Sequence, residues 1–329
     1  MHPQKLARSL SAILYYCESA SIHDLRFVDS LRKTHEVDLL QKEKDNKDNK
    51  EISYKALITS PLSVDLHGIK SIAPKRIFLS MGYDLNEHVK DEILKERIAK
   101  NLSTADMVVI DNPVLKQPLK EIFNFQRPIY VLPYGCKINE FQDISSPNTN
   151  NLGTNRSLSS IHNNSLIINA IHRIEKKKYG TFVFVKHGPK QDEFLTAHKE
   201  QLREIKHEVI QGGDEGVTKH FLSKVDLFIS ASQSDGSSVS LLEAMAARKL
   251  CIVSNHQANN YWIEHGVTGF CFDNTVESLA KTLEMVLAME TSDRTTLIEN
   301  AELKVQQEAN WDKNFNTFVG TLGKLISNP

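Results

Sequence analysis

Short apolar runs alternate with helical segments along nearly the whole chain, and this alternation restricts the fold more than any other feature. Strands that alternate with helices are typical of βαβ units, whose strands form a mostly parallel sheet. In the first half, a helical segment at 23–33 follows the first run. The runs rich in β-branched and aromatic residues are 12–17, 36–41, 54–60, 76–82, 105–112 and 128–135. The sequence therefore predicts an α/β fold.

The second half repeats the same alternation after a polar segment. Residues 142–155 are rich in Ser, Asn, Pro and Gly, a composition typical of a linker. A chain of 329 residues is long enough for about two domains, each with its own core. The second half contains expected strands at 181–188, 208–213, 226–232 and 250–255, and expected helices at 165–177, 193–207 and 240–249. We thus predict two α/β domains, residues 1–145 and 150–309.

The C-terminal tail has a different pattern. Its apolar residues recur at the spacing of one helix face, which predicts a helix over 310–329 with an apolar stripe. The stripe consists of Trp311, Phe315, Phe318, Leu322 and Leu325. Such a stripe must pack on a domain, either its own or the first one.

Charge and composition exclude several classes of function. Lys and Arg number 40 against 41 Asp and Glu, so the net charge of −1 argues against a nucleic-acid-binding protein. The N-terminus is a poor signal peptide and no apolar run approaches 20 residues, so we expect a cytoplasmic protein. The four cysteines are scattered and are interpreted as buried thiols, not as a zinc site or a disulfide framework.

The stretch SQSDGSSVSLLEAMA, residues 232–246, lies where a ligand is expected. It follows the apolar run 226–232, and parallel sheets bind ligands at the carboxyl ends of their strands. Gly236 permits a tight turn and a close approach by a ligand. Serines follow at 237, 238 and 240; they are suited to capping a helix whose first N–H groups favour an anion.

Two carboxylates, Asp235 and Glu243, flank this anion-favouring turn. The arrangement suits a sugar–diphosphate–nucleoside, with one acid accepting hydrogen bonds from sugar hydroxyls and the other from the ribose diol. The phosphates would then lie between them on backbone amides. A plain turn with an N-cap, in which Glu243 only favours the helix start, explains the same residues and stays open at this point.

Residues 234–272 resemble the nucleotide-sugar-binding segment of retaining glycosyltransferases of family 4, which have the GT-B fold. The resemblance rests on an acid, seven residues, a Glu followed by Ala-Met-Ala, a strand, and an "N…WI..G..G" stretch. Asp235 stands where the family usually has Glu, and Glu243 matches the second Glu. The later part of the pattern matches Asn259, Trp262, Gly266 and Gly269.

Weaker similarity extends to residues 13–27, 105–141 and 154–171, and the last of these places Arg156 at the arginine that holds the donor diphosphate. The resemblance implies two Rossmann-like α/β domains whose parallel sheets face each other across a cleft. It also implies that the C-terminal helix crosses back to the N-terminal domain, which would contain the acceptor site. The C-terminal domain would bind the nucleotide sugar.

Several positions depart from the family pattern. The usual diphosphate lysine is missing, and Ile161 stands near its place. We hypothesise that Lys186, in the turn that also contains Gly188, compensates for it; a surface lysine is the alternative. In the segment ending the first domain, Tyr134 and Lys137 replace the family's Asn and Asp.

The acceptor side also departs from the pattern. The glycine-rich first loop is absent, so Ser21 and His23 become acceptor-side candidates, with helix capping as the alternative for His23. Met81 takes the place of a family histidine, while Asp84 is retained as a candidate for binding acceptor hydroxyls.

The resemblance implies retaining transfer of a sugar from a nucleotide-diphosphate sugar to a hydroxyl of a glycan or glycolipid, in cell-surface polysaccharide or lipopolysaccharide synthesis. No metal or other cofactor is expected, and the acceptor implies peripheral contact with the cytoplasmic face of the inner membrane. Alternatives are a catalytically impaired GT-B-like binding subunit and another GT-B enzyme, such as a nucleotide-sugar epimerase. The implied catalytic residues are Arg156, Asp235 and Glu243. The implied donor-binding residues are Lys186, Gly188, Gly236, Ser237, Ser238, Val239, Ser240 and Asn259.

Overall fold

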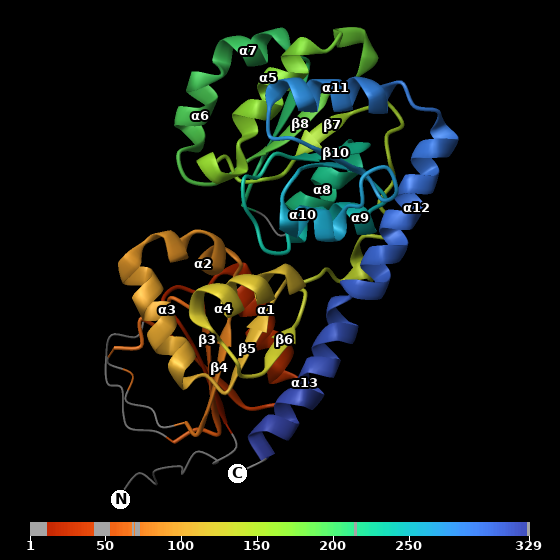
Figure 1. Ribbon diagram of the computed structural model, residues 1–329. Helices are drawn as coiled ribbons and strands as arrows, with labels where there is room; N and C mark the ends of the chain where they lie inside the picture. The colour runs from red at the N-terminus through yellow and green to blue at the C-terminus, as the bar shows by residue number, and fades with distance from the viewer. Residues whose placement is uncertain (1–11, 43–52, 68, 70–72, 214–215, 328–329) are drawn as a thin grey trace, which may run out of the picture. The chain divides into compact units, whose positions relative to one another are not determined.

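The computed structural model describes residues 12–42, 53–67, 69, 73–213 and 216–327, which form two compact units (Figure 1). The first unit takes in the chain up to Tyr134 and again from Asp312, and the second runs from Gly135 to Trp311. Each unit contains one six-stranded sheet with parallel strand pairs. The predicted α/β class, with two doubly wound domains, is confirmed.

In the first unit the strand order is β2-β1-β3-β4-β5-β6. The chain winds away from β1 in both directions, so the loops after β1 and β3 flank the point where the order reverses. The strands are β1 (Ile13–Cys17), β2 (Val37–Gln41), β3 (Ala56–Ser60), β4 (Lys75–Leu79), β5 (Met107–Ile110) and β6 (Ile129–Val131).

Helices cover both faces of this first sheet. Side chains of α3 (Glu92–Thr104) and α4 (Lys116–Phe123) pack with Phe78, Val108 and Ile110 on one face. On the other face, Phe27 of α1 (Ile22–Arg32) contacts the ring of Tyr15. The short helix α2 (Tyr83–Asn86) follows β4.

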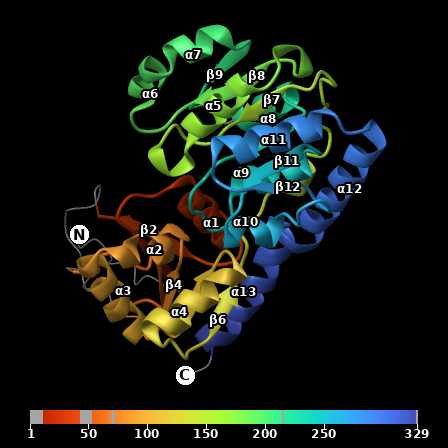
Figure 2. The same cartoon turned by 45° about the horizontal axis from the view of Figure 1, so that its top comes forward.

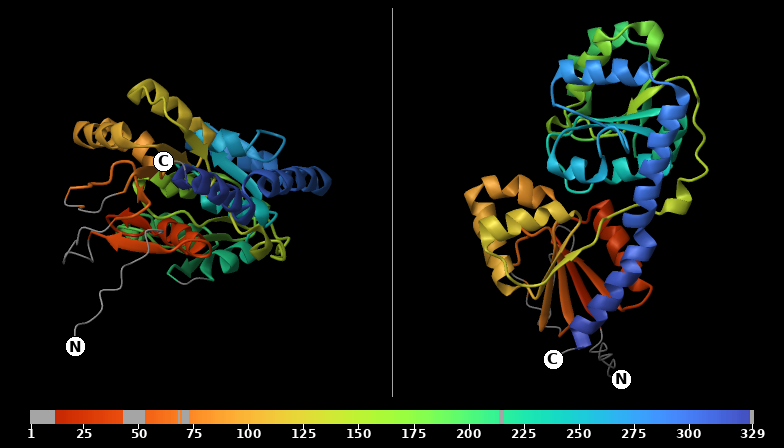
Figure 3. Two further views of the ribbon diagram at one scale, coloured as in Figure 1. Left: turned by 90° about the horizontal axis from the view of Figure 1, so that it is seen from below. Right: turned by 45° about the vertical axis from the view of Figure 1, so that its right-hand side comes forward.

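The last helix, α13 (Trp311–Ser327), packs on the first unit. The rings of Phe315 and Phe318 lie 5.2 and 5.5 Å from the ring of Phe27, and Phe318 lies 5.3 Å from Tyr130. Figure 3 shows this helix in blue alongside the strands of the first sheet. The expected apolar stripe is therefore a helix face that returns to the N-terminal unit.

In the second unit the order β12-β11-β10-β7-β8-β9 places the first and fourth strands of the unit side by side. This is the strand order of dinucleotide-binding folds, and its switch point lies between β7 and β10. The strands are β7 (Leu152–Thr154), β8 (Phe182–Lys186), β9 (His207–Gln211), β10 (Leu227–Ser230), β11 (Leu250–Ser254) and β12 (Phe270–Phe272).

The strand residues of the second sheet alternate between two cores. Phe182 and Phe184 pack with α5 (Asn164–Arg173) and α11 (Val276–Leu287). Val183 and Val185 pack on the opposite face with α8 (Val217–Lys224), α9 (Val239–Ala246) and α12 (Thr291–Glu308). The remaining α-helices in the described part of this unit are α6 (Gln191–Ala197), α7 (Lys199–Glu204) and α10 (Gln257–Trp262). Figure 2 shows these layers from another side.

The central strand β7 lies inside the segment that the sequence indicated as a linker. It is only three residues long and contains Gly153. A Cβ atom at Gly153 would lie 2.5 Å from a methyl of Val225 and 2.8 Å from the ring of Phe221, so a side chain there would clash with the packed core. Composition does not predict this strand, because it is short, contains a glycine and has polar residues on both sides.

The division between the units falls at Tyr134 and Gly135, whereas the polar segment 142–155 had indicated a linker. Cys136 belongs to the second unit because its N–H donates to Ala309 O at 3.1 Å and its carbonyl accepts from Trp311 N at 3.1 Å. The polar segment is fixed to the second unit as well. The Asp226 carboxylate accepts hydrogen bonds from the backbone N–H groups of residues 148, 149 and 151.

No helix in the described part of the chain combines the length and the apolar character that crossing a bilayer requires.

Candidate functional site

Two loops of the second unit meet at the switch point, one after β7 and one after β10. Arg156 follows β7 and its guanidinium points into the second loop. Its Nη1 donates to Ser238 Oγ at 2.8 Å and to Ser240 Oγ at 3.5 Å, and its Nη2 donates to Asp235 Oδ2 at 2.6 Å. The predicted residues Arg156, Asp235, Ser238 and Ser240 thus form one cluster.

The Arg156 side chain is fixed but not saturated. Only 10 % of it is exposed, and its Nε–H is buried without a hydrogen-bond partner. Burying an unpaired donor costs about 1–3 kcal/mol. A guanidinium can only donate, so the group that satisfies this N–H must be an acceptor. The cluster is therefore prepared for an anion or another strong acceptor.

Each serine at the start of α9 has a separate task. Ser238 is the N-cap, and its Oγ accepts from Leu241 N at 3.4 Å. Ser237 Oγ accepts from Nε1 of the buried Trp262 at 3.1 Å, which ties the loop to α10. Gly236 N donates to Asp235 Oδ1 at 3.0 Å and orients that carboxylate. Val239 begins the helix, whose amino end carries a partial positive charge.

Two histidines complete the cluster, and sequence reasoning missed both. His162 lies with Nδ1 3.1 Å from Arg156 Nη2 and 2.9 Å from Ser232 Oγ. His256 follows β11 and caps α10 through Nδ1, while its buried Nε2 has no hydrogen-bond partner. The signal for His256 was its place directly after an expected strand, at the same sheet edge as Asp235.

Both histidines are held in the neutral form. Burial, followed by the positive charge of Arg156, lowers the pKa of His162 to about 3. Burial also lowers the pKa of His256, against an opposing effect of Asp235. Desolvation disfavours the charged imidazole, so the fixed positive charge of this cluster comes from Arg156.

Lys186 and Gly188, the other predicted donor-side pair, lie at the end of the neighbouring strand β8. Lys186 Nζ forms an ion pair with Asp192 at 2.7 Å. Gly188 has φ +101°, and a Cβ there would lie 2.1 Å from Ser157 Oγ. The glycine therefore allows this turn to pack against the loop that follows β7.

Asn259 requires a correction. Its side chain is 2 % exposed, and its Nδ2 donates to Ser254 O at 2.9 Å inside the fold. It fastens α10 to the end of β11 and offers a ligand no exposed amide. Glu243 lies half-buried on α9, one turn beyond Val239.

The acceptor-side candidates all lie in the first unit. Ser21 is the N-cap of α1 and forms a capping box with Asp24. The ring of His23 stacks on that of Tyr134, with centroids 5.8 Å apart. Both residues lie near the carboxyl end of β1, at the edge where this sheet reverses its strand order.

Asp84 also requires a correction. It is fully buried, and its carboxylate accepts from Ser80 Oγ at 2.6 Å, Leu62 N at 2.8 Å and Leu85 N at 3.0 Å. Burial raises the pKa of this carboxyl against the opposing effect of these hydrogen bonds. The group holds the loops after β3 and β4 together and has no oxygen facing solvent, so it cannot bind an acceptor hydroxyl in this state.

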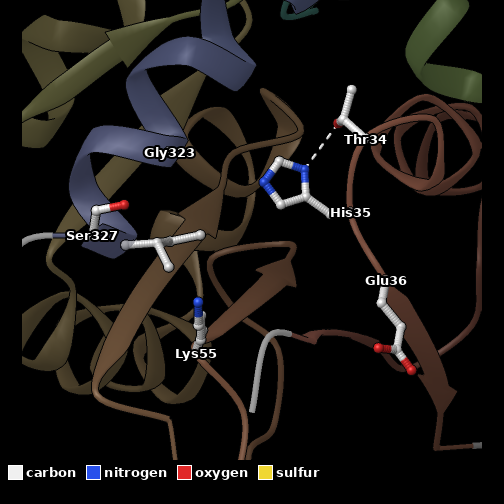
Figure 4. Close-up of a pocket in the computed structure, with 7 residues that line it drawn as sticks. Thr34, His35, Glu36, Lys55, Gly323 and Ser327 are labelled. Carbon is white, nitrogen blue, oxygen red and sulfur yellow. Dashed lines mark hydrogen bonds between the residues drawn. The ribbon is translucent and has the colours of Figure 1, made fainter. Parts of the chain in front are cut away.

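A cavity of about 250 Å³ lies in the first unit, at the opposite edge of its sheet (Figure 4). His35 and Lys55 line it just before β2 and β3 begin, and α13 closes it with Gly323 and Ser327. Ligands of parallel sheets bind at the carboxyl ends of the strands, so this cavity is not the expected site.

Within the described residues, no three His, Cys, Asp or Glu side chains gather in the way a metal ion requires. Transfer without a metal stays a prediction.

Comparison with solved structures defines the fold. The chain is similar to HepE from Anabaena, solved with UDP and glucose, at TM-score 0.77 and 13 % identity over 95 % of this chain and 100 % of that one. It is similar to sucrose-phosphate synthase from Thermosynechococcus elongatus at TM-score 0.81 and 13 % identity, over 97 % and 100 % of the chains. The pneumococcal O-GlcNAc transferase GtfA, solved with UDP and GlcNAc, gives TM-score 0.66 and 13 % identity over 84 % and 58 %. The fold is that of the GT-B glycosyltransferases.

Residues 146–304, just under half of the chain, match the family model "Glycosyl transferases group 1", so the second unit is similar to the glycosyltransferases of this group. This match and the GT-B fold together support a glycosyltransferase. The matched range contains Arg156, Asp235, Glu243 and the start of α9. A comparison with curated protein sequences found no match.

Proposed function

We propose that this protein is a retaining glycosyltransferase of family 4 that moves a sugar from a nucleotide-diphosphate sugar to a hydroxyl of a glycan or glycolipid. The observation that carries the proposal is the buried, unsaturated guanidinium of Arg156 beside the amino end of α9. A positive side chain and a helix amino end together favour a phosphate-bearing ligand. The similarity to HepE, solved with UDP and glucose, supports a nucleotide sugar as that ligand.

The chemistry follows from the leaving group. The bond between the anomeric carbon and the diphosphate oxygen breaks, and the acceptor oxygen forms the new bond on the same face. The acceptor proton passes to a phosphate oxygen of the departing diphosphate. Negative charge grows on that diphosphate, so Arg156 and the amino end of α9 stabilise the transition state more than the ground state.

The two carboxylates have different tasks in this proposal. Glu243, on α9, accepts hydrogen bonds from the ribose diol, and Asp235 accepts from hydroxyls of the transferred sugar. Asp235 forms an ion pair with Arg156 at 2.6 Å, so the donor diphosphate must share or replace this ion pair. The ion pair therefore preorganises Arg156 and also opposes binding of the diphosphate.

The acceptor enters, in this proposal, on the side of the first unit near Ser21 and His23. Its identity as a cell-surface polysaccharide or lipopolysaccharide precursor comes from the resemblance, as does a peripheral place at the cytoplasmic membrane face. No metal takes part in the proposed reaction.

A thermal-shift screen against UDP-glucose, UDP-N-acetylglucosamine, GDP-mannose and ADP-glucose tests the donor site. A donor at 100 times its Kd adds about 2.7 kcal/mol to the stability of the protein. We expect Glu243→Gln to abolish the shift, because the amide replaces an oxygen acceptor of the ribose diol by a donor. An unchanged shift in this variant would remove Glu243 from the site.

Turnover separates the transferase from the alternatives. Slow, steady release of nucleoside diphosphate from the bound donor supports an active transferase and excludes a binding subunit. Conversion of the free sugar nucleotide to an epimer, without an acceptor, would instead favour a nucleotide-sugar epimerase. The anomeric configuration of the product, read by NMR, decides whether the transfer retains configuration.

A further inference from the structure

His162 lies at the centre of the donor-side cluster, and the proposed chemistry gives it no task. Its Nδ1 lies 3.1 Å from Arg156 Nη2 and 2.9 Å from Ser232 Oγ. Since a guanidinium only donates, Nδ1 accepts this hydrogen bond and carries no hydrogen. With Nδ1 as the acceptor, the hydrogen of the neutral imidazole lies on Nε2, which is 3.5 Å from the same Arg156 Nη2.

The charged and titratable groups that face His162 come from three loops. Arg156 approaches from the loop after β7, Asp235 from the loop after β10 and His187 from the end of β8. A proton on His162 would place a second cation 3.1 Å from the guanidinium in a mostly buried position. These surroundings lower the pKa of His162 to about 3, with burial as the largest cause and Arg156 next.

A bound donor would favour the protonated imidazole over the neutral one. Its diphosphate brings two negative charges to the guanidinium that His162 contacts. Resting on the proposed function, we propose that His162 is a proton-dependent ligand of the donor diphosphate, which takes up a proton from solvent when the donor binds. Neighbouring anions favour the imidazolium, and a protonated ring donates from both nitrogens. The site thereby gains a second cation only when a phosphate is present to pair with it.

The sign of the pH dependence follows from this linkage. Donor binding raises the pKa of His162, so the bound state holds one more proton than the free state between the two pKa values. Affinity therefore increases as the pH falls. If the bound pKa reaches the ordinary histidine value near 6.5, the Kd is about tenfold lower at pH 5.5 than at pH 7.5. Both phosphates of a nucleotide sugar are esterified and do not titrate near neutrality, so the slope belongs to the protein.

Isothermal titration calorimetry tests the proposal on the full chain, with the nucleotide sugar among UDP-glucose, UDP-N-acetylglucosamine and GDP-mannose that binds most tightly. Measurements at pH 5.5, 6.5 and 7.5 give the slope. Repeating the titration at pH 6.5 in two buffers with unlike heats of ionisation counts the protons taken up. We expect about half a proton at that pH and the tenfold change in Kd across the range.

The variant His162→Asn keeps an acceptor near the position of Nδ1 but cannot take up a proton. We expect it to lose the pH slope, so that its Kd relative to that of the parent protein rises about tenfold from pH 7.5 to pH 5.5. His187→Asn is the matched control, because His187 faces the same cluster without touching Arg156, and it should retain the slope. His162→Gln replaces the Asn variant if the latter does not fold.

The outcomes distinguish a failure of the proton coupling from a failure of the proposed function. Donor binding with a flat pH profile, or a slope that persists in His162→Asn, overturns the proton coupling and leaves the proposed function standing. No binding of any of these nucleotide sugars at any pH removes the proposed function, and the proton coupling with it. A slope that His162→Asn abolishes and His187→Asn retains supports both.

Discussion

The two units have the same kind of sheet, yet the polar groups at their switch points are arranged in opposite ways. In each unit a serine caps a helix near the reversal of strand order, Ser21 on α1 and Ser238 on α9. Ser21 shares its cap with the Asp24 carboxylate, which places a negative group at the amino end of α1. Ser238 instead has the Arg156 guanidinium beside it. Only the second helix end is suited to an anion.

Hydrogen bonding separates the two sites in the same way. Asp24 is buried and accepts from Tyr15 Oη at 2.6 Å, from Ser21 N at 2.8 Å and from Ser60 Oγ. In the second unit, Arg156 Nε and His256 Nε2 are buried without partners. Thr59 Oγ1, near the end of β3 in the first unit, is also buried without a partner, so the two places differ in the charge of the unsatisfied group. Topology shows where a ligand can bind, and the unsatisfied guanidinium shows which of the two places favours an anion.

The largest expected effect is on the donor-side cluster around Arg156 in the second unit. Arg156→Ala removes the only guanidinium of the cluster, and we expect the kcat/KM for donor turnover to fall about 10²–10³-fold, the usual cost of losing one preorganised donor to a developing negative charge. Nucleoside diphosphate release under initial-rate conditions measures it. Arg173→Ala is the control, because Arg173 forms an exposed ion pair with Glu277 in the same unit. Equal activity in the two variants would contradict the assignment of Arg156.

A substitution in the hydrogen-bond network around Asp24 in the first unit should change stability instead of donor binding. Asp24→Asn replaces an acceptor by an amide, leaving buried hydroxyl and N–H donors unpaired, and we expect a loss of about 2 kcal/mol in the free energy of unfolding of the first unit. Hydrogen exchange of residues 12–42 reports this unit, while the two tryptophans, Trp262 and Trp311, report the second. Donor affinity should be unchanged. A weakened donor affinity would show that the first unit contributes to the donor site.

The smallest expected effects come from removing the two N-cap hydroxyls, which allows the two helix ends to be compared directly. Ser21→Ala and Ser238→Ala each remove an N-cap, and each should cost about 1 kcal/mol of stability in its own unit. Only Ser238→Ala also removes an acceptor of Arg156, so it alone should raise the donor Kd, about fivefold. Chemical denaturation and calorimetry on the two variants measure both quantities. Equal donor affinities in the two variants would argue that the Ser238 hydroxyl does not help to position Arg156.

Much of the fold was predictable because it depends on local pattern. The β1 and β10 runs and the stripe of α13 are strongly apolar with clear spacing, and they lie where the sequence indicated. β7 was not predictable, because three residues with a central glycine give no periodic signal. Asp84 and Asn259 looked like ligand-binding groups because their residue types suit that task, but burial decides whether a polar group faces a ligand or its own fold.

The sequence by itself determined that an acid–glycine–serine turn joins a buried strand to a helix, and the family resemblance added Arg156 to the same site. Only the tertiary structure decided that Arg156 forms an ion pair with Asp235, 79 residues away, and that His162 and His256 lie in the same cluster. The physical reason is the strand order. A local pattern fixes where a strand ends, but the crossover connections that lay β10 beside β7 decide which strand ends become neighbours.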